Sequence, residues 1–236
     1  MAGEAPAGRT GWSLRYPVLA TDYDGTLAHD GVTDALTIGA LERFREAGGQ
    51  LVLVTGRELP DLARTFDRLD LFERIVAENG GVAYDPATER ERLLAPPCDP
   101  ALPQALRSRG VQPLSIGRTI VATVEPHDGI VLDTIRDLGL ELQIIFNKGA
   151  VMVLPSGVNK ATGLTTVLAD LGVAPASVAG IGDAENDHAF LELCGLSVAV
   201  RNAILAVQER VHLVTAGVRG DGVRELIDWL LDDRLS

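Results

Sequence analysis

The chain has 236 residues, of which 46% are apolar, and a formal net charge of −12 at pH 7. An acidic chain with scattered Lys and Arg residues repels phosphate backbones and anionic lipid, which argues against nucleic acid and membrane surfaces as partners. It has no apolar run of the roughly 18 residues that a membrane-spanning helix needs. We therefore expect a globular protein whose negative charge favours a metal cation.

Residues 1–10 are small and polar, and residues 1–13 are expected to form a flexible tail. Cys98 and Cys194 lie far apart and lack the C-x-x-C spacing of a zinc site. Two unpaired thiols are typical of a reducing compartment, so a cytoplasmic location is expected. The sequence leaves the oligomeric state open.

Short apolar runs alternate with helix-period segments along most of the chain. Buried strands are predicted at residues 16–21, 50–55, 74–79, 177–182, 196–200 and 212–215. Amphipathic helices are predicted after Pro60, before Gly172 and over residues 223–231. This alternation predicts the α/β class, with a Rossmann-like doubly wound parallel sheet and helices on both faces.

One region interrupts this alternation. Four prolines between residues 96 and 103 discourage regular structure, and strand-like, helix-like, strand-like and strand-like segments follow. The last two strands flank Asn147-Lys148-Gly149, a link that predicts a hairpin. We therefore predict a core made of residues 14–85 and 157–236, with residues 86–156 inserted as a small α+β cap domain.

The stretch Asp22-Tyr23-Asp24-Gly25-Thr26 follows the first predicted strand. Side chains two apart share a face of a strand, so Asp22 and Asp24 can converge if the strand continues that far. A polar turn is the simplest alternative. A calcium loop is excluded, because Leu27 and Thr33 occupy the places of its Gly and Glu.

The ends of other predicted strands also carry polar residues. Thr55 and Gly56 offer a hydroxyl and an amide suited to a phosphate oxygen, and Lys160 precedes a predicted helix. Asp183 and Asp187 are four apart, so on a first helical turn they share a face, although a helix dipole also favours acids there. A dinucleotide site is excluded because Glu185 takes the place of its third glycine.

Taken together, these motifs resemble those of the haloacid dehalogenase superfamily. The motifs are D-x-D-G-T-L at 22–27, T-G-R at 55–57, the lysine at 160 and G-D-x-x-N-D at 182–187. Asn79-Gly80 and Asn202-Ala203 further resemble its Cof-like subgroup, and the insertion after the second motif resembles a type 2 cap. The chain is similar in this respect to phosphoglycolate and sugar-phosphate phosphatases.

The resemblance implies a role for each matching residue. Asp22 matches the nucleophile and Asp24 the acid/base; Thr55, Gly56 and Lys160 match the phosphate-binding residues. Mg²⁺ is implied as the cofactor, held by Asp22, Asp24 through its backbone carbonyl, Asp183 and Asp187. Secondary candidates are Arg57, Asn79 and Asn186, while Asn202 is implied to hold the loop near Asp183.

Electrostatics agrees with a metal in such a site. A phosphate brought to within 4 Å of these carboxylates is repelled by about 4 kcal/mol per charge pair at an effective dielectric of 20, which Mg²⁺ offsets. We therefore expect a magnesium-dependent phosphatase that acts on a small phosphorylated metabolite through an aspartyl-phosphate. A phosphomutase or phosphotransferase of the same fold and a non-catalytic phosphate- or nucleotide-binding module remain as alternatives. Arg118, His127 and Lys148 are the cap candidates for contacting the rest of the substrate.

Overall fold

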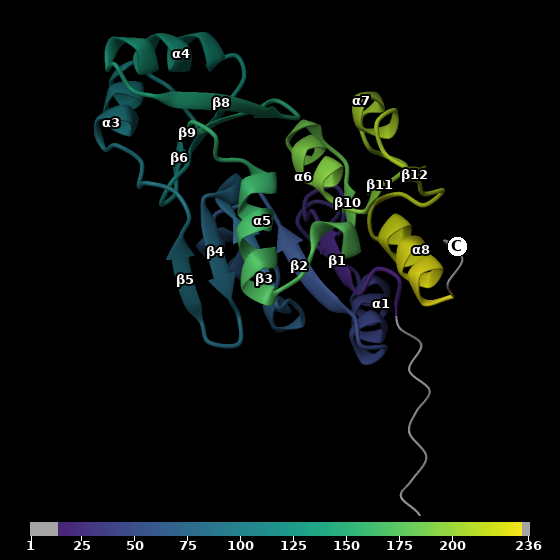
Figure 1. Ribbon diagram of the computed structural model, residues 1–236. Coiled ribbons are helices and arrows are strands. Elements are labelled where there is room, and N and C mark those ends of the chain that lie inside the picture. The colour runs from purple at the N-terminus through teal and green to yellow at the C-terminus, as the bar shows by residue number, and fades with distance from the viewer. Residues whose placement is uncertain (1–13, 233–236) are drawn as a thin grey trace, which may run out of the picture.

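An eight-stranded sheet forms the core of the structure, a computed structural model that describes residues 14–232. Its strand order is β12-β11-β10-β1-β2-β3-β4-β5 (Figure 1). The six predicted strands are all present, as β1 (Val18–Thr21), β2 (Gln50–Val54), β3 (Arg74–Ala77), β10 (Val178–Gly182), β11 (Leu196–Ala199) and β12 (Leu213–Val214). They run parallel, which confirms the α/β class. The predicted tail, residues 1–13, lies outside the described residues.

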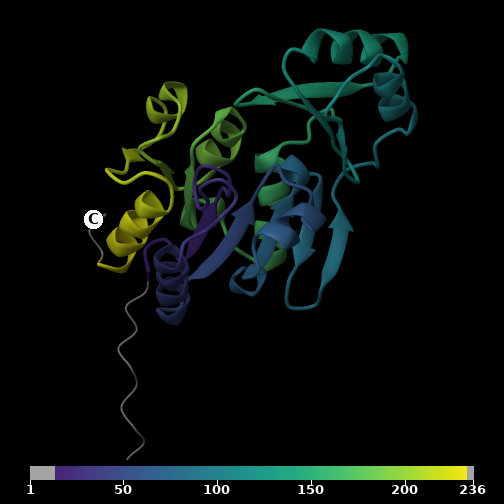
Figure 2. The same ribbon diagram turned by 180° about the vertical axis from the view of Figure 1, so that it is seen from behind.

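Helices cover both faces of this sheet. On one face lie α5 (Lys160–Leu171) and α6 (His188–Leu193); on the other lie α1 (Ala35–Glu46), α2 (Leu59–Thr65) and α8 (Arg219–Leu231), as Figures 1 and 2 show. A short helix, α7 (Leu205–Gln208), connects β11 to β12. None of the helices in residues 14–232 combines the length and hydropathy needed to cross a bilayer.

The helix predictions hold with one difference. Helix α5 ends before Gly172, which adopts the left-handed conformation at φ 69° that glycine tolerates. Helix α2 is shorter than predicted, because Phe66 leaves the helix in an extended conformation and is buried in the core. Leu69 starts a separate 3₁₀ turn, η1 (Leu69–Leu71).

Two antiparallel strands extend the core sheet beyond β3. Strand β4 (Val82–Asp85) pairs with β3, and β5 (Arg90–Leu93) pairs with β4. The charged, exposed sequence of β5 carries no strand signal, and the sequence analysis assigned it to the cap as part of residues 86–156. Its hydrogen bonds with β4 place it in the core sheet instead. We propose that the cap domain begins after Leu93.

The inserted region forms a second sheet with the order β6-β7-β9-β8. Its strands are β6 (Ser115–Ile116), β7 (Val121–Val124), β8 (Leu142–Asn147) and β9 (Ala150–Pro155), accompanied by α3 (Ala101–Ser108) and α4 (Asp128–Asp137). Helix α3 forms despite the prolines, because Pro100 precedes it and Pro103 lies in its first turn, where an amide hydrogen has no helical partner. The expectation that the prolines discourage regular structure holds for residues 94–100 and fails from Ala101 on.

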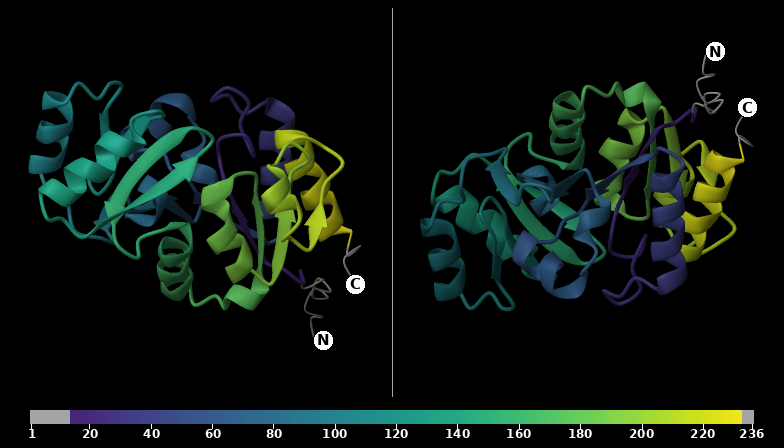
Figure 3. Two further views of the ribbon diagram at one scale, coloured as in Figure 1. Left: turned by 90° about the horizontal axis from the view of Figure 1, so that it is seen from above. Right: turned by 90° about the horizontal axis from the view of Figure 1, so that it is seen from below.

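The cap lies beyond the carboxyl ends of the parallel strands (Figures 1 and 3). Its β8–β9 hairpin turns at Lys148 and Gly149, both of which have positive φ, as the Asn-Lys-Gly link predicted. The hairpin reaches the 3₁₀ turn η4 (Glu185–Asp187), which follows β10 in the core. One edge of the cap is therefore held directly over the predicted site.

Candidate active site

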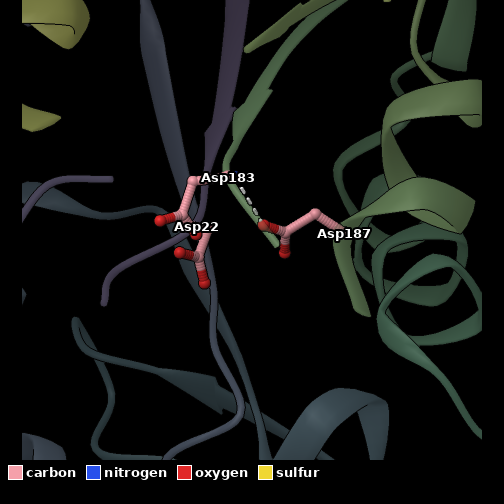
Figure 4. A group of neighbouring side chains, drawn as sticks. All are labelled: Asp22, Asp183 and Asp187. Atoms are coloured by element: carbon pink, nitrogen blue, oxygen red, sulfur yellow. Dashed lines mark hydrogen bonds between the residues drawn. The ribbon is translucent and has the colours of Figure 1, made fainter. Parts of the chain in front are cut away.

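Three aspartates converge at the carboxyl end of the core sheet. Asp22 follows β1 and Asp183 follows the neighbouring strand β10, and the Asp22 amide donates to the Ile181 carbonyl at 3.0 Å. Asp187 ends the turn η4 and points its carboxylate at the other two (Figure 4). One oxygen of each side chain lies within 4.8 Å of the others, and all three residues are buried.

Lys160 lies among these carboxylates as the first residue of α5. Its Nζ donates to Asp22 Oδ1 and to Asp187 Oδ1, both at 2.6 Å, and the residue is only 1% exposed. Asn159 caps the helix through its side chain and fixes where α5 begins. The local capping signal therefore positions a buried charge between Asp22 and Asp187.

The pKa shifts in the site follow from burial and charge. Burial raises the pKa of Asp22, the charge of Asp187 adds to this rise, and Lys160 opposes it without cancelling it. Burial acts to lower the pKa of Lys160, but the carboxylates of Asp187 and Asp22 outweigh it, so the pKa is raised and the ammonium stays charged. Lys160 is the fixed positive charge of the site.

Asp187 is positioned by a turn and not by a helical face. Its Oδ2 accepts from the amides of Asp183 at 2.8 Å and Ala184 at 3.0 Å. Asp183 and Asp187 lie together, as their i, i+4 spacing predicted. The cause differs from the one expected: Asp183 precedes the 3₁₀ turn, so the two residues are brought together by these hydrogen bonds and not by sharing a helical face. Gly182 leaves room for the Asp187 carboxylate, which a Cβ would approach to 2.7 Å.

The aspartate cluster fits a hard divalent cation. Asp183 Oδ1 is buried and has no hydrogen-bond partner among the described residues, so one oxygen is available for a ligand. Burial also raises the pKa of Asp183, as expected for a charge that lacks full compensation. Carboxylate oxygens are the ligands that such cations prefer.

Gly25 holds the loop after β1 against Asp183. It has φ +83°, and a Cβ there would overlap Asp183 Oδ2. Asn202 Nδ2 donates to the Gly25 carbonyl at 2.8 Å, while Asn202 Oδ1 accepts from the Arg219 amide at 2.7 Å. Asn202 thus connects this loop to the start of α8. Its Nδ2 also lies 3.4 Å from Asp183 Oδ2.

The Asp24 side chain does not join the cluster. Its two oxygens accept from Arg57 Nε at 2.7 Å and Nη2 at 2.8 Å, and Arg57 also bonds Asp61 at 2.7 Å. Strand β1 ends at Thr21, and Tyr23 begins a turn in which its carbonyl accepts from the amides of Leu27 and Ala28. Convergence of the Asp22 and Asp24 side chains required the strand to continue as far as Asp24, and this condition is not met because β1 ends at Thr21.

The remaining predicted residues lie beside the cluster. Thr55 Oγ1 accepts from the Arg57 amide at 3.1 Å, and Asn186 Nδ2 donates to Asn79 Oδ1 at 3.0 Å. A Cβ on Gly56 would lie 3.7 Å from Asn186 Nδ2. The buried atoms Asn79 Nδ2 and Asn186 Oδ1 lack a partner among the described residues, so this pair offers a free donor and a free acceptor.

The three cap candidates differ in whether their side chains reach the aspartate cluster. Lys148 forms an ion pair with Asp183. Arg118 pairs instead with Glu91 at 3.0 Å, and the His127 ring contacts the Gln112 carbonyl at 2.9 Å. Of the three, Lys148 alone reaches the aspartate cluster.

Sequence reasoning missed Glu78, which is 2% exposed at the junction of core and cap. Its carboxylate accepts from the amides of Arg118 at 2.9 Å and Thr119 at 2.7 Å, and from Thr119 Oγ1 at 3.0 Å. The only available signal was an acidic residue at the end of an apolar strand, next to Asn79.

Comparisons with known proteins agree with this geometry. A family model described as haloacid dehalogenase-like hydrolase matches residues 19–95 and 131–227. The chain is 32% identical over 228 residues to a phosphoglycolate phosphatase of Natronomonas pharaonis, covering 92% of this chain and 98% of the relative. It is 31% identical over 221 residues to one of Haloarcula marismortui, covering 89% and 96%. A solved HAD/COF-like hydrolase of Plasmodium vivax, 20% identical, superposes with a TM-score of 0.79 over 94% of this chain and 97% of that one.

Proposed function

The chain belongs to the haloacid dehalogenase-like hydrolase family, and we propose that it is a Mg²⁺-dependent phosphatase that hydrolyses a small phosphorylated metabolite through an aspartyl-phosphate. The single observation that carries the proposal is the buried cluster of Asp22, Asp183 and Asp187 around Lys160. A group of buried charges of this kind is costly to form, and a functional site is the usual reason to retain one.

Asp22 is the nucleophile in this proposal. Its carboxylate attacks phosphorus, an acyl-phosphate bond forms, and the bond from phosphorus to the leaving oxygen breaks. Lys160 stays protonated beside Asp22 and holds that carboxylate in place through the 2.6 Å hydrogen bond. Water then attacks the aspartyl-phosphate, releasing phosphate and regenerating Asp22.

Asp24 serves as the acid/base in this proposal. It gives a proton to the leaving oxygen and later accepts one from the attacking water. Since its carboxylate is held by Arg57, this role requires it to exchange the guanidinium for the substrate oxygen. Arg57 is therefore proposed to hold Asp24 at the edge of the site until substrate arrives.

Asp22, Asp183 and Asp187, with the backbone carbonyl of Asp24, would hold the Mg²⁺. When bound, the ion supplies positive charge that offsets the repulsion between these carboxylates and an anionic phosphate. The Thr55 hydroxyl, the Gly56 amide and Lys160 are proposed to bind the oxygens of the transferred group. Asn79 and Asn186, which hydrogen-bond to each other, are proposed to support these phosphate-binding residues.

The substrate class is proposed from the curated relatives and the cap. The relatives named above are phosphoglycolate phosphatases, which supports a phosphoglycolate-like substrate, and a small sugar phosphate is the second candidate. Lys148 is the cap cation in contact with the site, so it favours a substrate with negative charge near its leaving group.

The proposal predicts that Asp22→Asn removes phosphatase activity. An amide is a far weaker nucleophile, so release of inorganic phosphate from p-nitrophenyl phosphate and phosphoglycolate should fall at least about 10³-fold, while circular dichroism stays unchanged. The control is Asp70→Asn, which removes an equal charge at a surface pair with Arg68 and should keep full activity.

Near-normal turnover by Asp22→Asn would refute the nucleophile assignment. Measuring free phosphate also separates the alternatives, because a phosphomutase returns a new phosphoester in place of phosphate. A wild-type chain that binds phosphoglycolate without turning over either substrate would instead favour a non-catalytic binding module.

A further inference from the structure

Lysine is scarce in this chain, and both lysines lie at the aspartate cluster. Of 21 Lys and Arg residues, only Lys148 and Lys160 are lysines. Lys160 pairs with Asp22 and Asp187, and Lys148 pairs with Asp183. Together they provide an ammonium partner for each carboxylate of the cluster. A lysine ammonium is a compact charge on a flexible stem, unlike the planar guanidinium of arginine.

The two lysines differ in how they are held. Lys160 is 1% exposed and belongs to the core, whereas the Lys148 side chain is 42% exposed and comes from the tip of the β8–β9 hairpin of the cap. The Lys148 amide donates to Glu185 Oε2 at 3.2 Å, which holds the hairpin tip over η4. Lys148 is therefore a cation of the cap that reaches a carboxylate of the core.

The Lys148 ammonium lies next to Asp183 and close to Gly25. Its Nζ contacts Asp183 Oδ2 and lies 2.9 Å from the point where a Cβ on Gly25 would be. A divalent cation held by the three aspartates would bind the open Asp183 Oδ1 and draw charge from the same carboxylate that Lys148 contacts through Oδ2. Two cations close to one buried carboxylate repel each other, so the ammonium and the metal oppose each other's binding.

We propose that Lys148 is an exchangeable cation: the ammonium and the divalent metal are alternative partners of Asp183, so binding of the metal releases the cap hairpin from the core. This inference rests on the proposed function for the metal site and is independent of the identity of the substrate. By linkage, whatever weakens the Lys148–Asp183 pair strengthens metal binding, and metal binding weakens the pair.

Isothermal titration of the full chain with Mg²⁺, in the absence of substrate, tests the competition. Lys148→Gln removes the competing charge and should bind Mg²⁺ about tenfold more tightly, the ratio that one charge-assisted hydrogen bond produces. Lys148→Arg keeps a charge and should stay within about twofold of wild type. Arg136→Gln is the matched control, because it removes a positive charge from the cap surface, where Arg136 pairs with Asp133.

Each outcome of the titration decides the matter. Equal or weaker Mg²⁺ binding by Lys148→Gln overturns the proposal. An equal gain in affinity in Lys148→Arg also overturns it, because the shape of the side chain and not its charge would then matter. An equal gain in Arg136→Gln overturns it as well, because the net charge of the protein would then explain the effect. If wild type and Lys148→Gln both fail to bind Mg²⁺, the metal site of the proposed function is refuted as well. Tight but equal binding by both refutes only the exchange.

Hydrogen exchange gives a second readout that does not depend on activity. In wild type, saturating Mg²⁺ should speed exchange of the amides in residues 146–150 several-fold, because the hairpin tip loses its ion pair. In Lys148→Gln these amides should exchange fast with or without Mg²⁺. Unchanged exchange in wild type on adding Mg²⁺ would overturn the release of the hairpin.

Discussion

Lys160 illustrates how one buried residue sets the electrostatics of the site. Its ammonium lies 2.6 Å from oxygens of both Asp22 and Asp187, in a place where neither carboxylate can be solvated. Burying such a cation is costly, and its two carboxylate partners offset that cost. The same arrangement leaves Asp183 to pair with Lys148.

We predict that Lys160→Met lowers the free energy of unfolding by about 3–5 kcal/mol in EDTA, because it leaves two buried carboxylates unpaired. The loss should be clearly smaller in saturating Mg²⁺, which compensates the same charges. Urea unfolding under both conditions measures the difference, with Arg136→Gln as a charge-matched control. An equal loss with and without Mg²⁺ would contradict the idea that the ion and Lys160 share these carboxylates.

At the scale of single elements, a side-chain cap marks where α1 begins, as it does for α5. Asp34 precedes α1, and its Oδ1 accepts from the amides of Leu36 and Thr37, both at 2.9 Å. Burial acts to raise the pKa of Asp34, but hydrogen bonds from Thr37 and the charge of Arg224 outweigh it, so the pKa lies below its ordinary value. The charged form of Asp34 is therefore favoured in the folded state.

Asp34→Ala should cost about 1 kcal/mol of stability at pH 7. Because the folded pKa is lowered, the part of this contribution that depends on charge is complete above the unfolded pKa of about 3.9 and is lost as the pH falls through the folded value. Urea unfolding at pH 7 and pH 3.5 should show that the difference in unfolding free energy between wild type and Asp34→Ala is smaller at the lower pH. A gap that widens toward acid would refute this assignment.

At the scale of the whole molecule, Glu78 joins the two domains. It follows β3 of the core, and its buried carboxylate accepts three hydrogen bonds from residues 118 and 119 of the cap. The hairpin tip contacts η4 at another point, so the cap is attached to the core at both places. Of these two contacts, the one at Glu78 joins a buried charge to backbone amides.

We expect Glu78→Ala to loosen the cap without unfolding the core. Amides of β6 and β7 should exchange with deuterium several-fold faster, while those of β1 and β10 keep wild-type rates. Glu91→Ala is the control, because it removes only the side-chain ion pair with Arg118 at the same junction. Equal effects of the two substitutions, or faster exchange throughout the core, would argue against Glu78 as the specific attachment.

The sequence by itself determined the features that depend on local spacing. Apolar runs marked the six parallel strands, Gly172 marked the end of α5, and Asn147-Lys148-Gly149 marked the hairpin. Because parallel strands present their carboxyl ends at one edge, the sequence also placed Asp22 and Asp183 at the same edge of the sheet. These inferences hold because each rests on residues a few positions apart, or on a rule for the sheet as a whole.

Only the tertiary structure decided which of these residues touch. Asp24 forms an ion pair with Arg57, 33 positions away, and Lys148 of the cap forms one with Asp183, 35 positions away. The charged strand β5 joined the core sheet through its pairing with β4. In each case the deciding free energy comes from a partner distant in the chain, and no local pattern encodes where the fold brings that partner.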